Sequence, residues 1–141
     1  MKISFYVLLV CTFFAFQGMG QTVKTDVLVV GNGSNALAAG IQASVSGVKA
    51  TILMREADFD IINPAGSLSS GLQAEYSMRA SGKAVNTSNL IKSWTDSTTN
   101  LTVIKSVSWT KLKRAGGGWS MELSDGRKIR AHVLVNAERS G

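Results

Sequence analysis

The sequence predicts an α/β fold in which a mostly parallel sheet carries an antiparallel β-meander. Two observations lead to this prediction. A strand, a helix and a second strand follow one another over residues 26–54, and alternating segments separated by turn signals fill the C-terminal third. The chain has 141 residues, which corresponds to one domain, and 45% of them are hydrophobic, which is enough for a packed core.

Residues 1–20 have the pattern of an export signal. Lys2 supplies a positive start, an apolar run follows, and Gly18 and Gly20 are small residues where a signal peptidase could cut. The apolar run is shorter than the roughly 20 residues that span a bilayer. We therefore expect a signal peptide over 1–20 and an exported (periplasmic or extracellular) domain over 21–141 without a stable membrane span. An uncleaved anchor and a buried strand are the alternatives.

The first half of the domain reads as a βαβ unit. The apolar run Asp26–Val30 is typical of a strand covered on both faces, as in a parallel sheet. From Ser34 to Ser46 apolar residues recur at helical spacing, and Gly47 is a natural helix terminator. Ala50–Met54 then reads as a second buried strand.

The second half is predicted to be irregular at first and then rich in strands. Residues 57–88 combine Pro64 with glycines and serines, which favours loops. The later segments are divided by Gly116-Gly117-Gly118 and Asp125-Gly126, which are strong turn signals. The predicted elements are a helical turn near Ala74–Arg79, a helix Ser88–Ser97, a strand Leu101–Ile104, meander strands Val107–Lys113, Trp119–Leu123 and Lys128–Ala131, and a further buried strand His132–Asn136.

Composition argues against several functional classes. Cys11 is the one cysteine and His132 the one histidine, so neither a disulfide framework nor a Cys- or His-based metal site can be built. The net charge is +6, but the basic residues are dispersed apart from a run at 111–114. Nucleic-acid binding needs a concentrated basic face, so we expect a solvated basic surface and no nucleic-acid partner.

The most informative motif is the turn Gly31-Asn32-Gly33-Ser34-Asn35-Ala36, which follows a predicted strand and opens a predicted helix. Gly31 allows a sharp turn out of the strand, Gly33 lets the backbone approach a pyrophosphate, and Ala36 lets the helix pack closely on the sheet. The backbone amides of Ser34 and Asn35 would face the phosphates at the positive end of the helix dipole. This order of elements predicts a Rossmann-like dinucleotide-binding fold.

A carboxylate in the right place supports the same interpretation. Glu56 lies 20 residues after Ala36 and follows the second predicted strand. An acid there can accept hydrogen bonds from the hydroxyls of an adenosine ribose. The alternative is a βαβ unit whose glycines serve only turns.

Residues 26–56, DVLVVGNGSNALAAGIQASVSGVKATILMRE, resemble the N-terminal FAD-binding segment of FAD-dependent oxidoreductases of the glutathione-reductase type, including exported bacterial members. Residues 100–137 resemble the strand, meander and returning strand that this family places against the adenine half of FAD. The resemblance implies that FAD is the cofactor and that the chain is the N-terminal part of such an enzyme, incomplete for catalysis alone.

Carried over to this sequence, the resemblance assigns further cofactor contacts. The backbone around Trp109 would lie near the adenine, and Asn136 and Ala137 would fall where the returning strand turns back toward the pyrophosphate. The loop Gly66–Gly71 would approach the flavin.

Other functions stay open. An NAD(P)-binding dehydrogenase domain and a non-catalytic truncated relic are the alternatives. Arg55 beside Glu56 could neutralise the phosphate of NADP, but the retained acid argues against it. Catalytic residues, substrate and oligomeric state are not predicted, because no nucleophile–base pair can be named. The remaining candidates are interpreted as structural or solvated residues: Trp94, Trp119, His132, Asp58, Asp60, Tyr76 and Arg79.

Overall fold

The computed structural model describes residues 20–61, 71–80 and 86–138. The predicted signal peptide, except Gly20, and residues 66–70 of the predicted flavin-side loop lie outside the described residues. No helix among the described residues is long and apolar enough to cross a membrane. The elements in chain order are β1 (Thr22–Val30), α2 (Ser34–Val45), β2 (Ala50–Leu53), α3 (Leu72–Ala80), α4 (Thr87–Ser97), β3 (Leu101–Ile104), β4 (Trp109–Ala115), β5 (Gly118–Leu123) and β6 (Lys128–Asn136).

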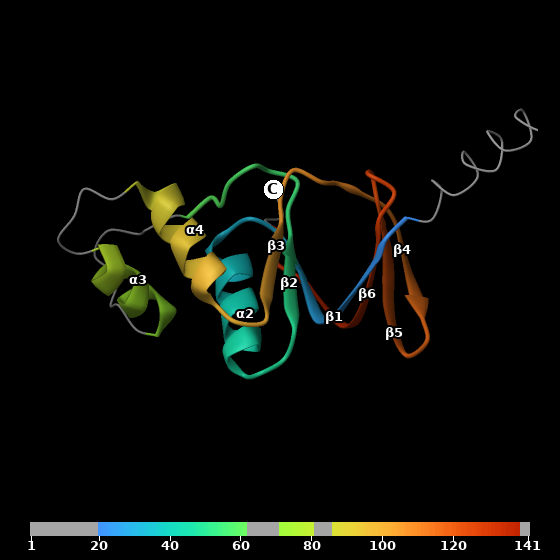
Figure 1. Cartoon of the computed structure of the whole chain (residues 1–141), viewed down its shortest axis with the longest axis horizontal. Coiled ribbons are helices and arrows are strands. Elements are labelled where there is room, and N and C mark those ends of the chain that lie inside the picture. Colours follow the sequence, from blue (N-terminus) through green and yellow to red (C-terminus); the bar gives the residue numbers. More distant parts are fainter. Residues whose placement is uncertain (1–19, 62–70, 81–85, 139–141) are drawn as a thin grey trace, which may run out of the picture.

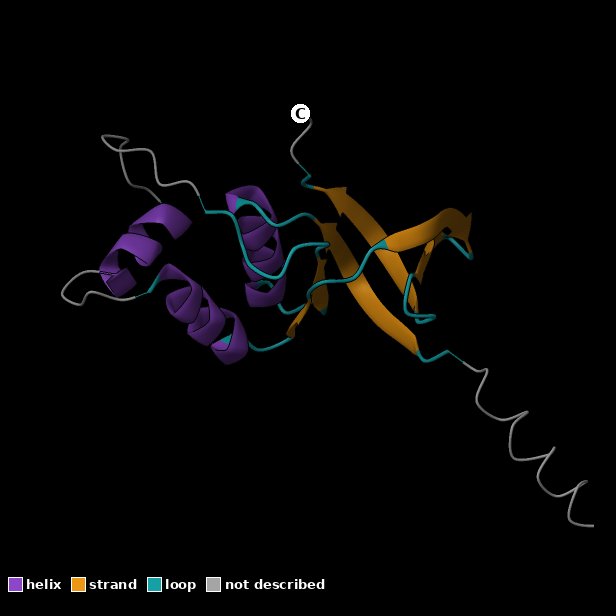
Figure 2. Ribbon diagram, turned by 90° about the horizontal axis from the view of Figure 1, so that it is seen from above, coloured by secondary structure: helices purple, strands orange, loops and turns teal. Residues whose placement is uncertain are grey.

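All six strands form one sheet in the order β3-β2-β1-β6-β5-β4 (Figure 1). The first four are parallel, whereas β5 and β4 are antiparallel additions beside β6. The helices gather at one side of the parallel half (Figure 2), with α2 against β1 and β2 and α4 against β3. The predicted α/β fold, a Rossmann-like parallel sheet with an antiparallel meander, is therefore confirmed.

Small residues allow α2 to pack closely on the sheet. Ala36 is fully buried in a cluster with Val29 and Ile52. A Cβ added at Gly40 would lie 2.5 Å from Cδ1 of Ile52, so only glycine fits there without a shift of this side chain. The predicted helix Ser34–Ser46 is thus observed almost to the residue, and Gly40 is a packing contact that the sequence analysis did not identify.

The other side of the sheet encloses the larger core, between the parallel half and the meander. Its buried residues include Leu28 and Val30, with Val23 packed against them. In a regular strand Val23 and Leu28 would point to opposite faces. Here β1 bends, because the N–H groups of Asp26 and Val27 both donate to the carbonyl of Lys49, at 2.9 and 3.0 Å. The bend turns both halves of the strand toward one core.

Two predictions about the C-terminal strands need correction. Lys128–Ala131 and His132–Asn136 are one continuous strand, β6, and its second half is not buried: Val133 is 50% exposed. The reason is that β5 pairs with β6 only as far as Ala131, so within the described residues β1 alone flanks the second half. The first meander strand also begins two residues later than predicted, at Trp109.

The predicted turns and helices of the second half are present. Gly116 and Gly117 have φ of 58° and 78°, which a two-residue hairpin turn with both residues at positive φ requires. In the next turn, the Arg127 side chain hydrogen-bonds the Asp125 carboxylate and holds the pKa of Asp125 below its ordinary value. The predicted helical turn near 74–79 is the longer helix α3. Helix α4 begins at Thr87, with the side chain of Asn86 accepting the N–H of Ser88 at 2.9 Å.

Candidate functional site

The glycine turn lies where β1 ends, at the edge of the sheet where all four parallel strands end. Gly31 donates its N–H to Leu53 at 3.0 Å and has a φ of 138°, which side chains rarely adopt. A Cβ on Gly31 would lie 2.6 Å from the carbonyl oxygen of Ala137. Ala137 also donates its N–H to Val30 at 2.8 Å, so the end of β6 is fixed against the turn. The turn and Ala137 are brought together as the sequence analysis expected.

The N-terminus of α2 presents backbone amides without a competing cap. Gly33 is the N-cap, with φ −83° and ψ 178°, and no side chain caps the helix. The first helical hydrogen bond runs from the N–H of Leu37 to Gly33 at 3.1 Å, so the amides of Ser34, Asn35 and Ala36 have no acceptor within the helix. The first turn contains no acidic residue. These amides and the helix dipole are suited to an anion.

The space beside Gly33 is open among the described residues. A Cβ built on Gly33 would meet no atom within 4 Å, and the negative φ does not itself require glycine. The glycine therefore serves neither a strained backbone nor the packing seen here. An absent side chain at a helix N-terminus fits the close approach of a phosphate group.

The segment after β2 contacts the glycine turn through its backbone. Asp60 donates its N–H to the carbonyl of Asn32 at 2.8 Å and forms an isolated bridge with Gly33. Asp58 lies 3.4 Å from the ammonium group of Lys105. Both acids are exposed, as their interpretation as solvated residues implies, although Asp58 has Lys105 as a partner and the backbone of Asp60 holds the chain along the glycine turn.

Glu56 lies three residues beyond the end of β2 and is exposed to solvent. Its carbonyl accepts the N–H of Ser106 at 3.0 Å, which ties the segment after β2 to the segment after β3. Its carboxylate makes no hydrogen bond or ion pair with other described residues. The acid is thus at the same edge of the sheet as the glycine turn, with its side chain free for a ligand.

Arg55 after β2, Glu138 after β6 and Trp109 at the start of β4 meet at this edge. The guanidinium carbon of Arg55 lies 3.9 Å from the ring centroid of Trp109, and Nη1 of Arg55 lies 3.8 Å from Oε1 of Glu138. Trp109 was expected here for its backbone and Arg55 was considered beside Glu56, but Glu138 was not among the predicted site residues. The signal was available, because Glu138 lies two residues after a strand predicted to end at this edge.

The other candidates have structural or solvent-exposed positions. Trp94 is buried in the helical layer, and the exposed His132 lies 3.3 Å from the carboxylate of Asp26. Arg79 pairs with Glu75 within α3. Among the described residues no group of three or more His, Cys, Asp or Glu could hold a metal ion.

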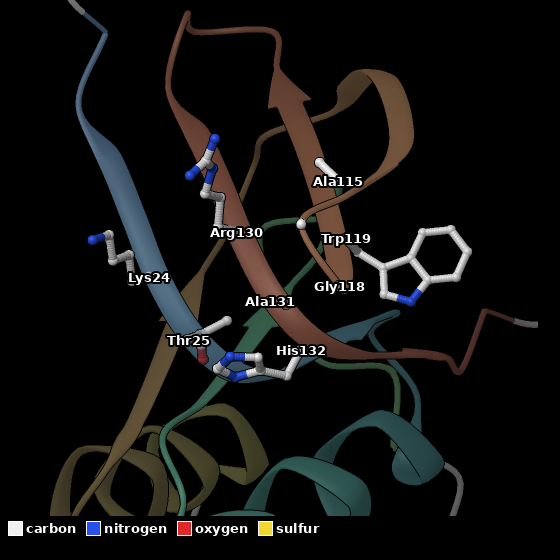
Figure 3. A pocket seen from close by; sticks show the side chains of 9 residues that line it. Lys24, Thr25, Ala115, Gly118, Trp119, Arg130, Ala131 and His132 are labelled. Atoms are coloured by element: carbon white, nitrogen blue, oxygen red, sulfur yellow. The ribbon is translucent and has the colours of Figure 1, made fainter.

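A hollow of about 230 Å³ lies elsewhere, between β1, β6 and the β4–β5 turn (Figure 3). Lys24 and Arg130 lie on neighbouring strands at this hollow, and the Trp119 indole points away from them. Lys24 lies in the first half of β1, whereas the glycine turn follows Val30, the last residue of β1. The hollow is therefore at the other end of the strand and is not part of the candidate site.

Comparison with known proteins supports the fold. No protein-family model matches the chain, and no curated protein matches it. The structure is similar to the bacillithiol disulfide reductase of Staphylococcus aureus (14% identity, TM-score 0.59, 83% of this chain and 39% of the other). It is also similar to the flavin monooxygenase of Stenotrophomonas maltophilia (20%, 0.55, 81% and 38%) and to the T. acidophilum thioredoxin reductase (24%, 0.52, 80% and 34%).

The chain spans less than half the length of each of these three proteins. At such identities the likeness concerns the fold alone. The described residues thus have the mixed parallel and antiparallel Rossmann-like fold that occurs in these oxidoreductases.

Proposed function

We propose that the chain is the FAD-binding module of a flavin-dependent oxidoreductase. The observation that carries the proposal is the N-terminus of α2, which has no side-chain cap, has first amides without an acceptor in the helix, and lies beside open space at Gly33. A diphosphate satisfies such amides and complements the helix dipole. The free carboxylate of Glu56 at the same edge supplies an acceptor for ribose hydroxyls.

One further observation favours FAD over NAD(P). Along the chain, the meander strands β4 and β5 come between β3 and β6, where an NAD-binding domain usually continues with further strand–helix units. Bound FAD would supply the redox chemistry, and the chain would bind and orient it. The reaction and the substrate of the whole protein belong to the proposal as well, because the chain spans only part of its structural neighbours.

Isothermal titration of purified protein with FAD, ADP, NADH and NADPH tests the proposal. We expect FAD to bind more tightly than either nicotinamide nucleotide, with ADP retaining a substantial part of the affinity because it carries the diphosphate and the ribose. Tighter binding of NADH or NADPH than of FAD would favour the dehydrogenase alternative. Protein that binds none of the four would contradict the proposal.

We also propose that residues 1–20 direct export. The support is the charge and hydropathy pattern of that segment. Expression of the chain in a bacterium, followed by fractionation and N-terminal sequencing, should give protein outside the cytoplasm that begins at Gln21. Cytoplasmic protein that retains Met1 would contradict this proposal.

A further inference from the structure

The side chain of Arg55 extends from the end of β2 toward Glu138, across the end of β1 where the glycine turn begins. We infer that Arg55 is a positioning residue: by holding the Glu138 carboxylate away from the amides of α2, it sets the affinity of the site for a diphosphate. The inference rests on the proposed function, because it concerns the same site.

The position of Glu138 makes its charge important. A Cβ on Gly31 would lie 3.0 Å from the backbone nitrogen of Glu138, so the backbone of this residue is packed against the glycine turn. Its N–H donates to Oδ1 of Asn136 at 3.1 Å, which fixes it further. A carboxylate anchored there can itself turn toward the amides at the N-terminus of α2 and would repel an incoming diphosphate.

Arg55 is placed to prevent this. In the sheet order β2-β1-β6, β1 separates the strand before Arg55 from the strand before Glu138. The 3.8 Å contact between Nη1 of Arg55 and Oε1 of Glu138 therefore crosses the end of β1, where the turn begins. The contact of the guanidinium with Trp109, 3.9 Å from the ring centroid, restricts the Arg55 side chain to this direction.

Stacking on Trp109 makes arginine the suitable residue. A planar guanidinium stacks on an indole and contacts a carboxylate at the same time, whereas the compact ammonium of lysine keeps the charge but stacks poorly. We therefore expect Arg55→Lys to lose most of the positioning effect although it conserves the charge. A role of Arg55 as a direct phosphate ligand predicts the opposite, since a lysine also binds phosphate.

A double-mutant cycle measured by isothermal titration with FAD tests the inference. We expect Arg55→Ala to weaken binding about fivefold and Glu138→Gln to strengthen it about threefold, as expected for a single surface charge. In the Glu138→Gln background, Arg55→Ala should change the affinity by less than about twofold. Both single effects should shrink at high ionic strength.

Matched controls come from an exposed ion pair on α4, between Lys92 and Asp96 at 2.6 Å. Lys92→Ala and Asp96→Asn make the same changes in net charge away from the glycine turn and should leave the affinity for FAD unchanged within about twofold. Thermal melts without ligand confirm that each variant is folded.

The outcomes separate the two proposals. If Arg55→Ala weakens binding equally in both backgrounds, the positioning role is wrong although the proposed function stands. If Arg55→Lys binds FAD as the native protein does, the role of stacking is overturned. If native protein does not bind FAD at all, the proposed function fails and the inference fails with it.

Discussion

Gly33→Asp should stabilise the protein and abolish dinucleotide binding. The backbone of Gly33 already has the extended conformation of a helix N-cap, and no side chain caps α2. An aspartate carboxylate at this position would accept the N–H of a residue in the first turn of the helix. It would then occupy a donor that the proposed function assigns to a diphosphate, and its negative charge would repel the ligand.

The size of both effects follows from the structure. Relative to glycine, an N-cap aspartate contributes a few tenths of a kcal/mol (about 0.3 kcal/mol), and the negative charge at the helix N-terminus adds about 0.5 kcal/mol. No clash with described residues offsets this gain, because a Cβ on Gly33 would meet none of their atoms within 4 Å. The melting temperature should rise by roughly 3 °C for a domain of this size. The lost amide bond and the repulsion together should lower the affinity for FAD about a hundredfold or more.

The assays are thermal unfolding without ligand and isothermal titration with FAD. Gly33→Ala is the matched control, because it adds a Cβ without an acceptor oxygen: we expect its stability to change by less than about 0.5 kcal/mol. A Gly33→Asp variant that is more stable and still binds FAD with native affinity would refute the role of the α2 amides. A less stable variant would refute the assignment of Gly33 as an open N-cap.

Three further predictions concern the framework of the site. Gly31→Ala should lower the free energy of unfolding, measured in urea, by about 3 kcal/mol or more. The reason is that φ is 138° and the new Cβ would lie 2.6 Å from the carbonyl oxygen of Ala137. An unchanged unfolding midpoint would contradict this geometry. Ser106 has a φ of 57°, which strains the backbone of a residue with a side chain. Ser106→Gly should therefore raise the urea unfolding midpoint by the equivalent of about 0.5 kcal/mol. A lower midpoint would show that the substitution does not relieve this backbone strain. Lys24 lies opposite Arg130 on the neighbouring strand, and neither forms an ion pair with other described residues. Lys24→Glu should therefore raise the melting temperature by roughly 2 °C at low salt and by less at high salt. A change in melting temperature that does not depend on salt would exclude the charge explanation.

Local patterns made much of the fold predictable. The apolar run before Gly31 and the helical spacing after Ser34 identified β1 and α2, and glycines at turn positions separated the strands of the meander. These features depend on neighbours in the sequence, for which periodicity and turn chemistry are direct signals.

The features that escaped prediction depend on distant parts of the chain. The bend of β1 arises where Lys49 accepts two N–H groups, and no residue pattern announces it. The exposure of Val133 depends on how far β5 extends along β6. The contact of Arg55 with Trp109 and Glu138 exists only because three strands end, or begin, at one edge of the sheet. Sequence reasoning placed the residues at this edge but could not pair their side chains.

The central claim is that the backbone amides at the start of α2 bind the diphosphate of FAD. The most direct measurement is a series of amide nitrogen–proton NMR spectra of the labelled protein during titration with FAD. We predict that the largest shifts occur at Ser34, Asn35 and Ala36, with smaller shifts at Gly31 and Glu56. Binding that leaves these amides unchanged, or shifts confined to the hollow at Lys24 and Arg130, would contradict the account.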